Sequence, residues 1–133
     1  MKLELKHLAP YLPYGLLLWH SYNKKSYPLV VHNGTVSMKG GFNINEVIYH
    51  NDAIKPILRP LSDLTKEIEV NGKKFVPIEE IKESQHHLFF REDIENPLEG
   101  MQYSEIQKLI EWHFDVFGLI EAGLAIDINT LSE

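Results

Sequence analysis

An Asn-Gly pair at residues 33 and 34 constrains this chain more tightly than any other feature of its sequence. It separates two β-type runs, LVVH and TVSM, and a two-residue Asn-Gly loop favours a type I′ turn between antiparallel strands. That turn pairs Leu29 with Met38 and Val31 with Val36. Because side chains alternate across a strand, these four residues share one face, and the other face is mostly polar. The sequence therefore predicts a hairpin with a defined inner face.

A second Asn-Gly pair, at residues 71 and 72, predicts a second hairpin. Its register pairs Ile68 with Phe75 and sets Glu69 opposite Lys74. The preceding run LSDLTKEI also predicts a short helix capped by Ser62. Pro77 is typical of the first turn of another short helix. Further β-type runs, GLLLWHSY, EVIYH and AIKPIL, lie within the first 60 residues.

The second half of the chain predicts one long helix. Ser104 and Gln107 have the spacing of a capping box, and EIQKLIEWHFDVFGLIEA follows without a proline until Gly123 offers a stop. A period of 3.6 residues places five apolar residues on its inner face. They are Ile106, Leu109, Ile110, Phe117 and Ile120. The run LAIDIN beyond it predicts a last short strand or an ordered tail.

Length and composition limit the class of protein. A chain of 133 residues fits one domain with a sizeable core, and 44% hydrophobic with 24% charged residues is typical of a soluble globular protein. Cysteine is absent, which excludes disulfides and thiolate chemistry. No apolar run near the start is long enough for a signal peptide or a membrane span. We therefore expect a cytoplasmic protein.

The net charge of -6 is unevenly distributed. Residues 1–60 carry seven Lys and Arg against three Asp and Glu, whereas residues 61–133 carry six against sixteen. The first half is thus basic and the second strongly acidic. A split of this kind indicates an interaction surface.

The segment EWHFDVF raises the question of a His-Asp catalytic pair. On a helix, with about 100° per residue, His113 lies within the apolar stripe and Asp115 about 200° from it, so the two cannot touch. We therefore expect a core histidine whose ring bonds a backbone carbonyl or another buried group. The alternative is a ligand or base that faces a pocket, since histidine titrates near neutral pH.

Histidines and carboxylates also gather in QHHLFFREDIENPLEG. Residues of these types coordinate divalent metals, but the segment lacks a recognised ligand spacing and is more typical of a solvated loop. The residues concerned are His86, His87, Glu92, Asp93 and Glu95. Phosphate-loop, dinucleotide, nucleophile-elbow and HExxH motifs are absent from the sequence. We predict no catalytic residue, no bound metal and no cofactor.

Aromatic and basic residues in the first half favour a second hypothesis, a nucleic-acid-binding surface. Aromatic rings stack on bases and cations contact phosphate. The residues expected at such a surface are Trp19, Lys24, Lys25, Lys39, Lys55 and Arg59. The same aromatics are equally typical of strand packing.

Four stretches carry a family resemblance: LAPYLPYGL, IKPILRPLSDLTKEI, KFVPI and EWHFDVFGLIEAGLAIDIN. They resemble short proteins encoded by phages and prophages of Bacteroides-type gut bacteria, a family without an assigned activity. The resemblance implies a mobile-element setting and a cytoplasmic host, and it transfers no catalytic residues. Residues from about 21 to 47 match no such pattern.

We therefore expect an α+β protein. A curved antiparallel sheet or small partial β-barrel from the first half is expected to pack against the C-terminal amphipathic helix. The chain is expected to form one domain over residues 1–133, β-rich and basic over 1–60 and helical and acidic over 61–133. The expected core is Leu16, Leu18, Leu29, Val31, Val36, Ile57, Ile68, Phe75, Ile106, Leu109, Ile110, Phe117 and Ile120.

The function expected from these features is that of a non-catalytic binding or accessory protein of a phage or mobile element. It would act through contacts with another protein or with a second copy of itself. No association with a membrane is expected. The alternative is a nucleic-acid-binding module that uses the basic, aromatic first half. A metal-dependent hydrolase built on His86 and His87 is the third hypothesis.

Overall fold

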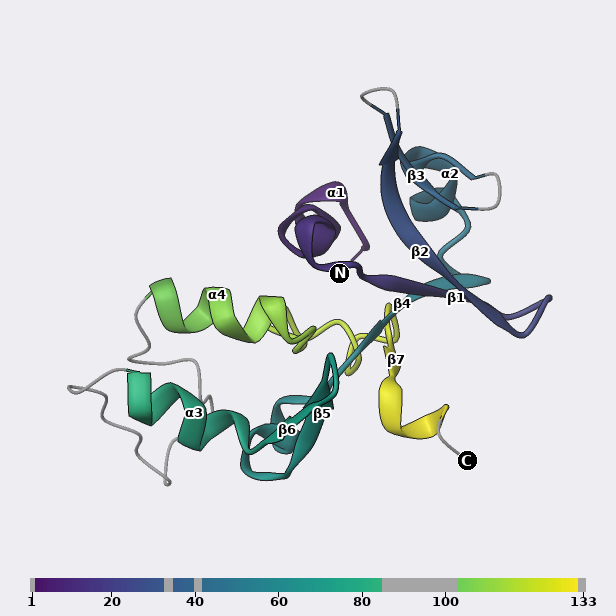
Figure 1. Ribbon diagram of the computed structural model, residues 1–133. Helices are drawn as coiled ribbons and strands as arrows, with labels where there is room; N and C mark the ends of the chain where they lie inside the picture. Colours follow the sequence, from purple (N-terminus) through teal and green to yellow (C-terminus); the bar gives the residue numbers. More distant parts are fainter. Residues whose placement is uncertain (1, 33–34, 40–41, 85–102, 132–133) are drawn as a thin grey trace.

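The computed structural model describes residues 2–32, 35–39, 42–84 and 103–131. Within these residues, seven strands form two sheets, whose arrangement can be followed in Figure 1. They are β1 (Leu17–His20), β2 (Lys25–His32), β3 (Thr35–Met38), β4 (Ile54–Leu58), β5 (Ile68–Val70), β6 (Lys73–Phe75) and β7 (Ile126–Asp127).

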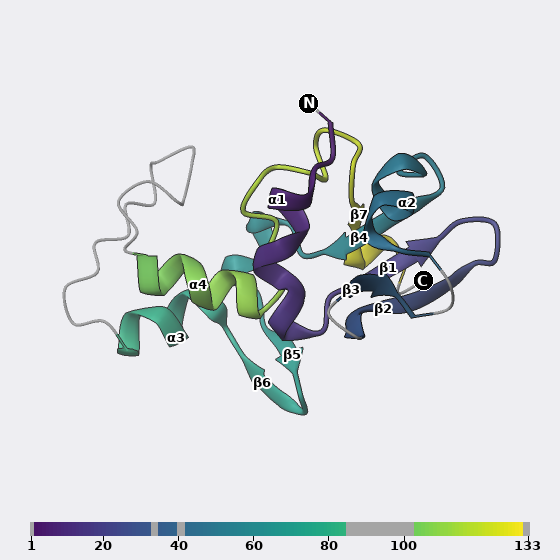
Figure 2. The same cartoon turned by 90° about the horizontal axis from the view of Figure 1, so that it is seen from above.

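Helical segments surround these strands. The α-helices are α1 (Leu5–Leu8), α2 (Ile44–Tyr49), α3 (Pro77–Ser84) and α4 (Tyr103–Glu111), and the 3-10 helices are η1 (Ala9–Tyr14), η2 (Leu61–Thr65) and η3 (Ile128–Thr130). Seen from above, α1 and η1 lie between the larger sheet and the α3–α4 pair (Figure 2). None of the described helices is both long enough and apolar enough to span a membrane.

The larger sheet is mixed and open. Its strand order is β3-β2-β1-β4-β7, and every neighbouring pair is antiparallel except β4 and β7, which run parallel. The α+β class is confirmed. The sheet is not antiparallel throughout, because the C-terminal segment adds β7 alongside β4, and it does not close on itself.

Both predicted hairpin registers are confirmed. Leu29 pairs with Met38 in the first hairpin, and Ile68 pairs with Phe75 in the second. The inner face of the first hairpin is buried only at one end, since Leu29 and Met38 are 3% exposed whereas Val31 is 57% exposed. The expectation that Val31 lies in the core is wrong, because this end of β2 projects past α2 (Figure 1).

The run EVIYH is helical rather than extended, so its predicted strand is wrong. Asn43 caps α2: its side-chain oxygen accepts a hydrogen bond from the backbone N–H of Glu46 at 2.9 Å, and the Glu46 carboxylate accepts one from the Asn43 N–H at 3.4 Å. This reciprocal pair satisfies two N-terminal donors of the helix. It outweighs the β-propensity of Val47, Ile48 and Tyr49.

The predicted long helix ends early. The helix α4 begins at Tyr103, so Ser104 is inside it rather than capping it, and it stops at Glu111. His113 then has a φ of 63°. The backbone N–H of Arg59 donates to the His113 carbonyl, and the N–H of Asp115 donates to the Arg59 carbonyl, each at 2.8 Å. The chain leaves the helix because it pairs with the end of β4.

This early end changes which aromatic residue is buried. Phe114 is fully buried, whereas Phe117 is 36% exposed. The Phe117 ring makes T-shaped contacts with the rings of His7 and Tyr11. The expected core position of Phe117 is therefore wrong. The helix α4 packs against η1 and α3 and does not cover the sheet as expected.

Two other local predictions have mixed outcomes. The expected short helices after Pro60 and at Pro77 are present as η2 and α3, but Pro60 rather than Ser62 is the N-terminal cap of η2. The predicted strand in LAIDIN is confirmed as β7. The helical turns α1 and η1 were not predicted.

The interior consists of two apolar clusters. The first, beneath one face of the larger sheet, comprises Leu3, Leu8, Tyr11, Leu16, Leu18, Leu29, Met38, Val47, Ala53, Ile54, Leu58, Leu119 and Ala125. The second comprises Leu64, Ile68, Ile81, Leu109 and Phe114. The half-buried Val116 packs against both. Of the other expected core residues, Ile57 is buried, and Val36, Phe75, Ile106, Ile110 and Ile120 are half-buried.

Candidate functional site

A cleft of about 480 Å³ opens where the two apolar clusters meet. Its volume lies within the range of about 300 to 1,000 Å³ that is typical of ligand sites. Five separate parts of the chain build it: η1 with the start of β1, the end of β4, the β5–β6 hairpin, the end of α4, and η3. The lining residues are Pro13, Tyr14, Leu17, Arg59, Glu69, Val70, Asn71, Glu111, Trp112, His113 and Ile128.

Arg59 fastens the walls of this cleft to one another. Its Nε donates a hydrogen bond to the Trp112 carbonyl at 3.1 Å, and its Nη2 donates to the Glu69 carbonyl at 3.2 Å. Partial burial lowers the pKa of the guanidinium, and nearby Asp63 opposes that shift. An arginine keeps its charge under all ordinary conditions. Two of its side-chain nitrogens are thus already committed to backbone oxygens of the protein.

His113 lines the cleft in an uncommon backbone conformation, because few non-glycine residues adopt a positive φ. Its Nε2 lies 2.6 Å from the Tyr14 carbonyl oxygen. A carbonyl only accepts, so Nε2 carries the proton and Nδ1 of the neutral ring is an acceptor. Burial lowers the pKa of His113; the bond to Tyr14 opposes this, and the Arg59 charge adds to it. The imidazole is therefore uncharged at neutral pH.

His113 and Asp115 have separate partners. The buried Asp115 carboxylate accepts from the backbone N–H groups of Leu119 at 2.7 Å and Ile120 at 2.9 Å. The prediction that the two residues form no dyad is confirmed, although the helical geometry used to reach it is wrong. The histidine bonds a backbone carbonyl as expected and also faces the cleft.

The cleft has acidic residues at its rim and a lining that is partly apolar and partly polar. Glu69 and Glu111 are exposed, and neither forms an ion pair or a side-chain hydrogen bond within the described part of the chain. The Trp112 ring packs on Phe75, with ring centroids 4.8 Å apart. Sequence reasoning missed this site, since its residues come from distant segments. His113 and Arg59 were singled out from the sequence, each for a different role.

The structure brings only some of the residues expected at a nucleic-acid surface close together. Trp19 on β1 lies opposite Lys55 on β4. Lys25 pairs with His20, the residue after Trp19, and so points to the other face of the sheet, and Lys24 lies in the turn before it. These residues share one end of the sheet. Lys39 follows the edge strand β3, and Arg59 lies in the cleft.

A smaller cavity of about 180 Å³ adjoins an aromatic group on the larger sheet. Phe42 stacks on His20 with centroids 6.0 Å apart, and it also contacts His50. Tyr22, at the mouth, is 78% exposed. The backbone N–H of Asn23 donates to His20 Nδ1 at 3.3 Å, so this imidazole also has an internal partner.

Metal ligation at His86, His87, Glu92, Asp93 and Glu95 was considered from the sequence. These residues lie outside those that the structure describes. Within residues 2–32, 35–39, 42–84 and 103–131, no three His, Asp or Glu side chains gather closely enough to hold a metal ion.

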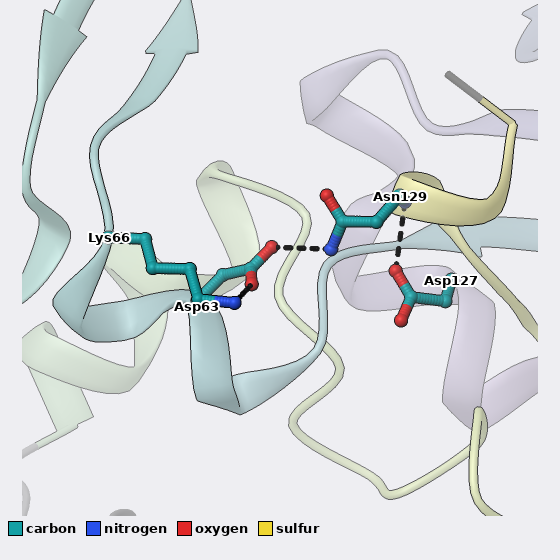
Figure 3. A network of polar contacts seen from close by, with 4 residues as sticks. All are labelled: Asp63, Lys66, Asp127 and Asn129. Atoms are coloured by element: carbon teal, nitrogen blue, oxygen red, sulfur yellow. Dashed lines mark hydrogen bonds and ion pairs between the residues drawn. The ribbon is translucent and has the colours of Figure 1, made fainter. Parts of the chain in front are cut away.

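A buried carboxylate outside the cleft, Asp63, anchors the C-terminal segment (Figure 3). Its Oδ2 accepts from Asn129 Nδ2 at 2.9 Å, and its Oδ1 lies 3.5 Å from Lys66 Nζ. Asp127 accepts from the Asn129 backbone N–H at 2.9 Å and so caps η3. This network ties η3 to η2, which positions Ile128 in the wall of the cleft.

Comparison of the chain with protein-family models, with curated proteins and with solved structures finds no significant match.

Proposed function

We propose that this chain is a non-catalytic binding protein that holds a segment of a partner polypeptide in the cleft between its two apolar clusters. The observation that carries this proposal is the composition of the cleft: apolar walls from Leu17, Val70 and Trp112, with hydrogen-bond acceptors at the rim. Binding sites for ligands typically combine an apolar lining with a few polar groups that fix orientation.

The chemistry of the lining favours binding over catalysis. General acid–base catalysis requires a side chain within reach of a reacting proton, usually oriented by a further group. His113 is oriented by a backbone carbonyl, and no carboxylate of the described residues bonds its ring. Arg59 is engaged in holding the walls together.

The open face of the larger sheet extends the cleft. Residues alternate across β1, so Leu18 and His20 are buried while Leu17 is 40% exposed and Trp19 is half-buried. Neither Leu17 nor Trp19 belongs to the two apolar clusters. A partner segment in the cleft would continue over this face, where an apolar anchor typically supplies most of the binding energy.

The proposal is tested by selecting peptides from a random displayed library against the purified full chain and measuring their affinity. Leu17→Asp should weaken the selected peptides about tenfold or more, because it places a charge in the apolar wall. The matched control Glu121→Gln lies on an exposed residue away from the cleft and should bind normally. Circular dichroism checks that both variants remain folded.

Failure to enrich any peptide, or equal binding by Leu17→Asp and the wild type, would contradict the proposal. Light scattering of the same samples determines whether the partner is a second copy of the chain. A dimer that dissociates in the Leu17→Asp variant would identify self-association through the cleft. The further proposal, that it is an accessory protein of a phage or mobile element, rests only on the four sequence stretches quoted above, and no match among known proteins supports it.

The second candidate is nucleic-acid binding, favoured by Trp19 and Lys55, which lie opposite each other on one face of the sheet, with Lys24 in the turn at the same end. A phosphate backbone held there should bind more weakly as salt rises, with a slope set by the number of contacts. Absence of a mobility shift with single- or double-stranded DNA at low salt would dispose of this candidate.

A further inference from the structure

We infer that the cleft selects an arginine side chain of its partner, an inference that rests on the proposed function of the cleft as a polypeptide-binding site. The starting observation is charge. The cleft holds two carboxylates, Glu69 and Glu111, against the single cation Arg59, and His113 is neutral. A cationic ligand group therefore meets a net negative charge there.

The two carboxylates are available to a ligand. Two acidic side chains near the cleft-forming segments have internal partners: Glu80 binds Lys73 at 2.9 Å, and Asp63 lies 3.5 Å from Lys66. Glu69 and Glu111 have no such partner among the described residues. Even Lys74, which lies opposite Glu69 in the hairpin, forms no ion pair with it.

The cation already in the cleft is partly engaged by the protein. Nε and Nη2 of Arg59 donate to the Trp112 and Glu69 carbonyls, which leaves three of the five N–H groups of a guanidinium. A phosphate or carboxylate that approached these groups would also meet the two rim carboxylates. The cleft therefore discriminates against acidic partners by unpaired charge.

The remaining polar groups suit a planar, many-donor cation. His113 Nδ1 is an acceptor at neutral pH because Nε2–H is fixed on Tyr14. The Asn71 side-chain oxygen is a further acceptor in the lining. Trp112 adds an aromatic wall, and a guanidinium stacks on aromatic rings and directs five N–H donors at separate acceptors. A lysine ammonium has three donors and no plane to stack.

The experiment uses the ¹⁵N-labelled full chain and three blocked amino acids: acetyl-arginine amide, acetyl-lysine amide and acetyl-citrulline amide. Citrulline has nearly the shape of arginine without the charge. The arginine probe should shift the amide resonances of Glu69, Asn71, Trp112 and His113 and bind most tightly. Glu69→Gln and Glu111→Gln should each weaken it about threefold, as expected for an exposed ion pair. The control Glu121→Gln should leave it unchanged.

Equal binding of the lysine or the citrulline probe would overturn the inference, as would arginine binding that is indifferent to both glutamine substitutions. These outcomes are distinguishable from failure of the proposed function. The selected peptides could lack arginine and still bind the Leu17→Asp variant more weakly than the wild type. That result would support the cleft as a polypeptide-binding site and refute its preference for arginine. The exposed positions of Glu69 and Glu111 keep the fold intact in either variant.

Discussion

At the scale of single residues, the hydrogen bonding and the pKa of a buried polar group depend on the partner that the fold places beside it. Tyr11 is fully buried, and its hydroxyl donates to the Phe114 carbonyl. The hydroxyl oxygen of Tyr11 in turn accepts from the backbone N–H of Val116 at 3.3 Å. Burial raises the pKa of this phenol, and nearby Asp115 adds to the rise. The bond joins residues about a hundred positions apart, so no local pattern in the sequence announces it.

His113 provides a test at this scale. Its pKa is lower in the folded state than the ordinary value of 6.5. The folded protein therefore favours the neutral ring, and this contribution to stability is fully present above pH 6.5. It is lost as the pH falls through the folded-state pKa. Lowering the pH from about 7.5 to about 5 should therefore destabilise the wild type more than His113→Gln. Glutamine retains a donor for Tyr14.

Thermal or urea unfolding of both proteins across this pH range measures the effect. The other histidines are present in both proteins, so the difference between the two stability curves isolates position 113. Parallel stability curves for the two proteins would show that His113 does not have a depressed pKa.

At the scale of elements, hairpins and helices differ in how well local rules predict them. The Asn-Gly turns set both hairpin registers because the turn geometry leaves one pairing of the strands that follow. The helix α4 has strong periodicity over its whole predicted length, yet it stops at Glu111 where the backbone of Arg59 competes for hydrogen bonds. Tertiary pairing thus overrides helix propensity.

The cap of α2 supplies a prediction at this scale. Asn43→Ala should destabilise the protein by about 1 kcal/mol, because it removes the acceptor for the Glu46 N–H. Asn45→Ala, at an exposed position within the same helix, is the matched control and should have little effect. Chemical denaturation measures both. An equal loss in the two variants would mean that the Asn43 side chain does not hold this segment helical.

At the scale of the whole molecule, the two apolar clusters are joined by the Tyr11–Phe114 hydrogen bond, by Val116 and by the hydrogen bonds of Arg59. Its side chain reaches the end of α4 and the β5–β6 hairpin, while its backbone pairs with both sides of Phe114. Val116 is packed against both clusters. The cleft lies at this junction, so its shape depends on how firmly the clusters are held together.

Arg59→Met should therefore lower stability by about 1.5 to 3 kcal/mol, the usual value of a hydrogen bond from a charged group, and broaden the melting transition. Lys55→Met, on the strand that leads into Arg59, is the comparison and should melt near the wild-type temperature, because the Lys55 side chain forms no hydrogen bond or ion pair among the described residues. Scanning calorimetry distinguishes one transition from two. A sharp, unshifted transition in Arg59→Met would show that the clusters are coupled elsewhere.

The sequence by itself determined the α+β class, both hairpin registers and the helix at Pro77, and it left LAIDIN as a short strand or an ordered tail, because turn chemistry and alternation act over a few neighbouring residues. Tertiary structure alone decided where α4 ends, that Phe114 rather than Phe117 is buried, that the sheet stays open, and that Arg59, Glu69, Trp112 and His113 meet in one cleft. The physical reason is that hydrogen bonds to a distant backbone compete with local propensity, and their partners are known only once the chain has folded.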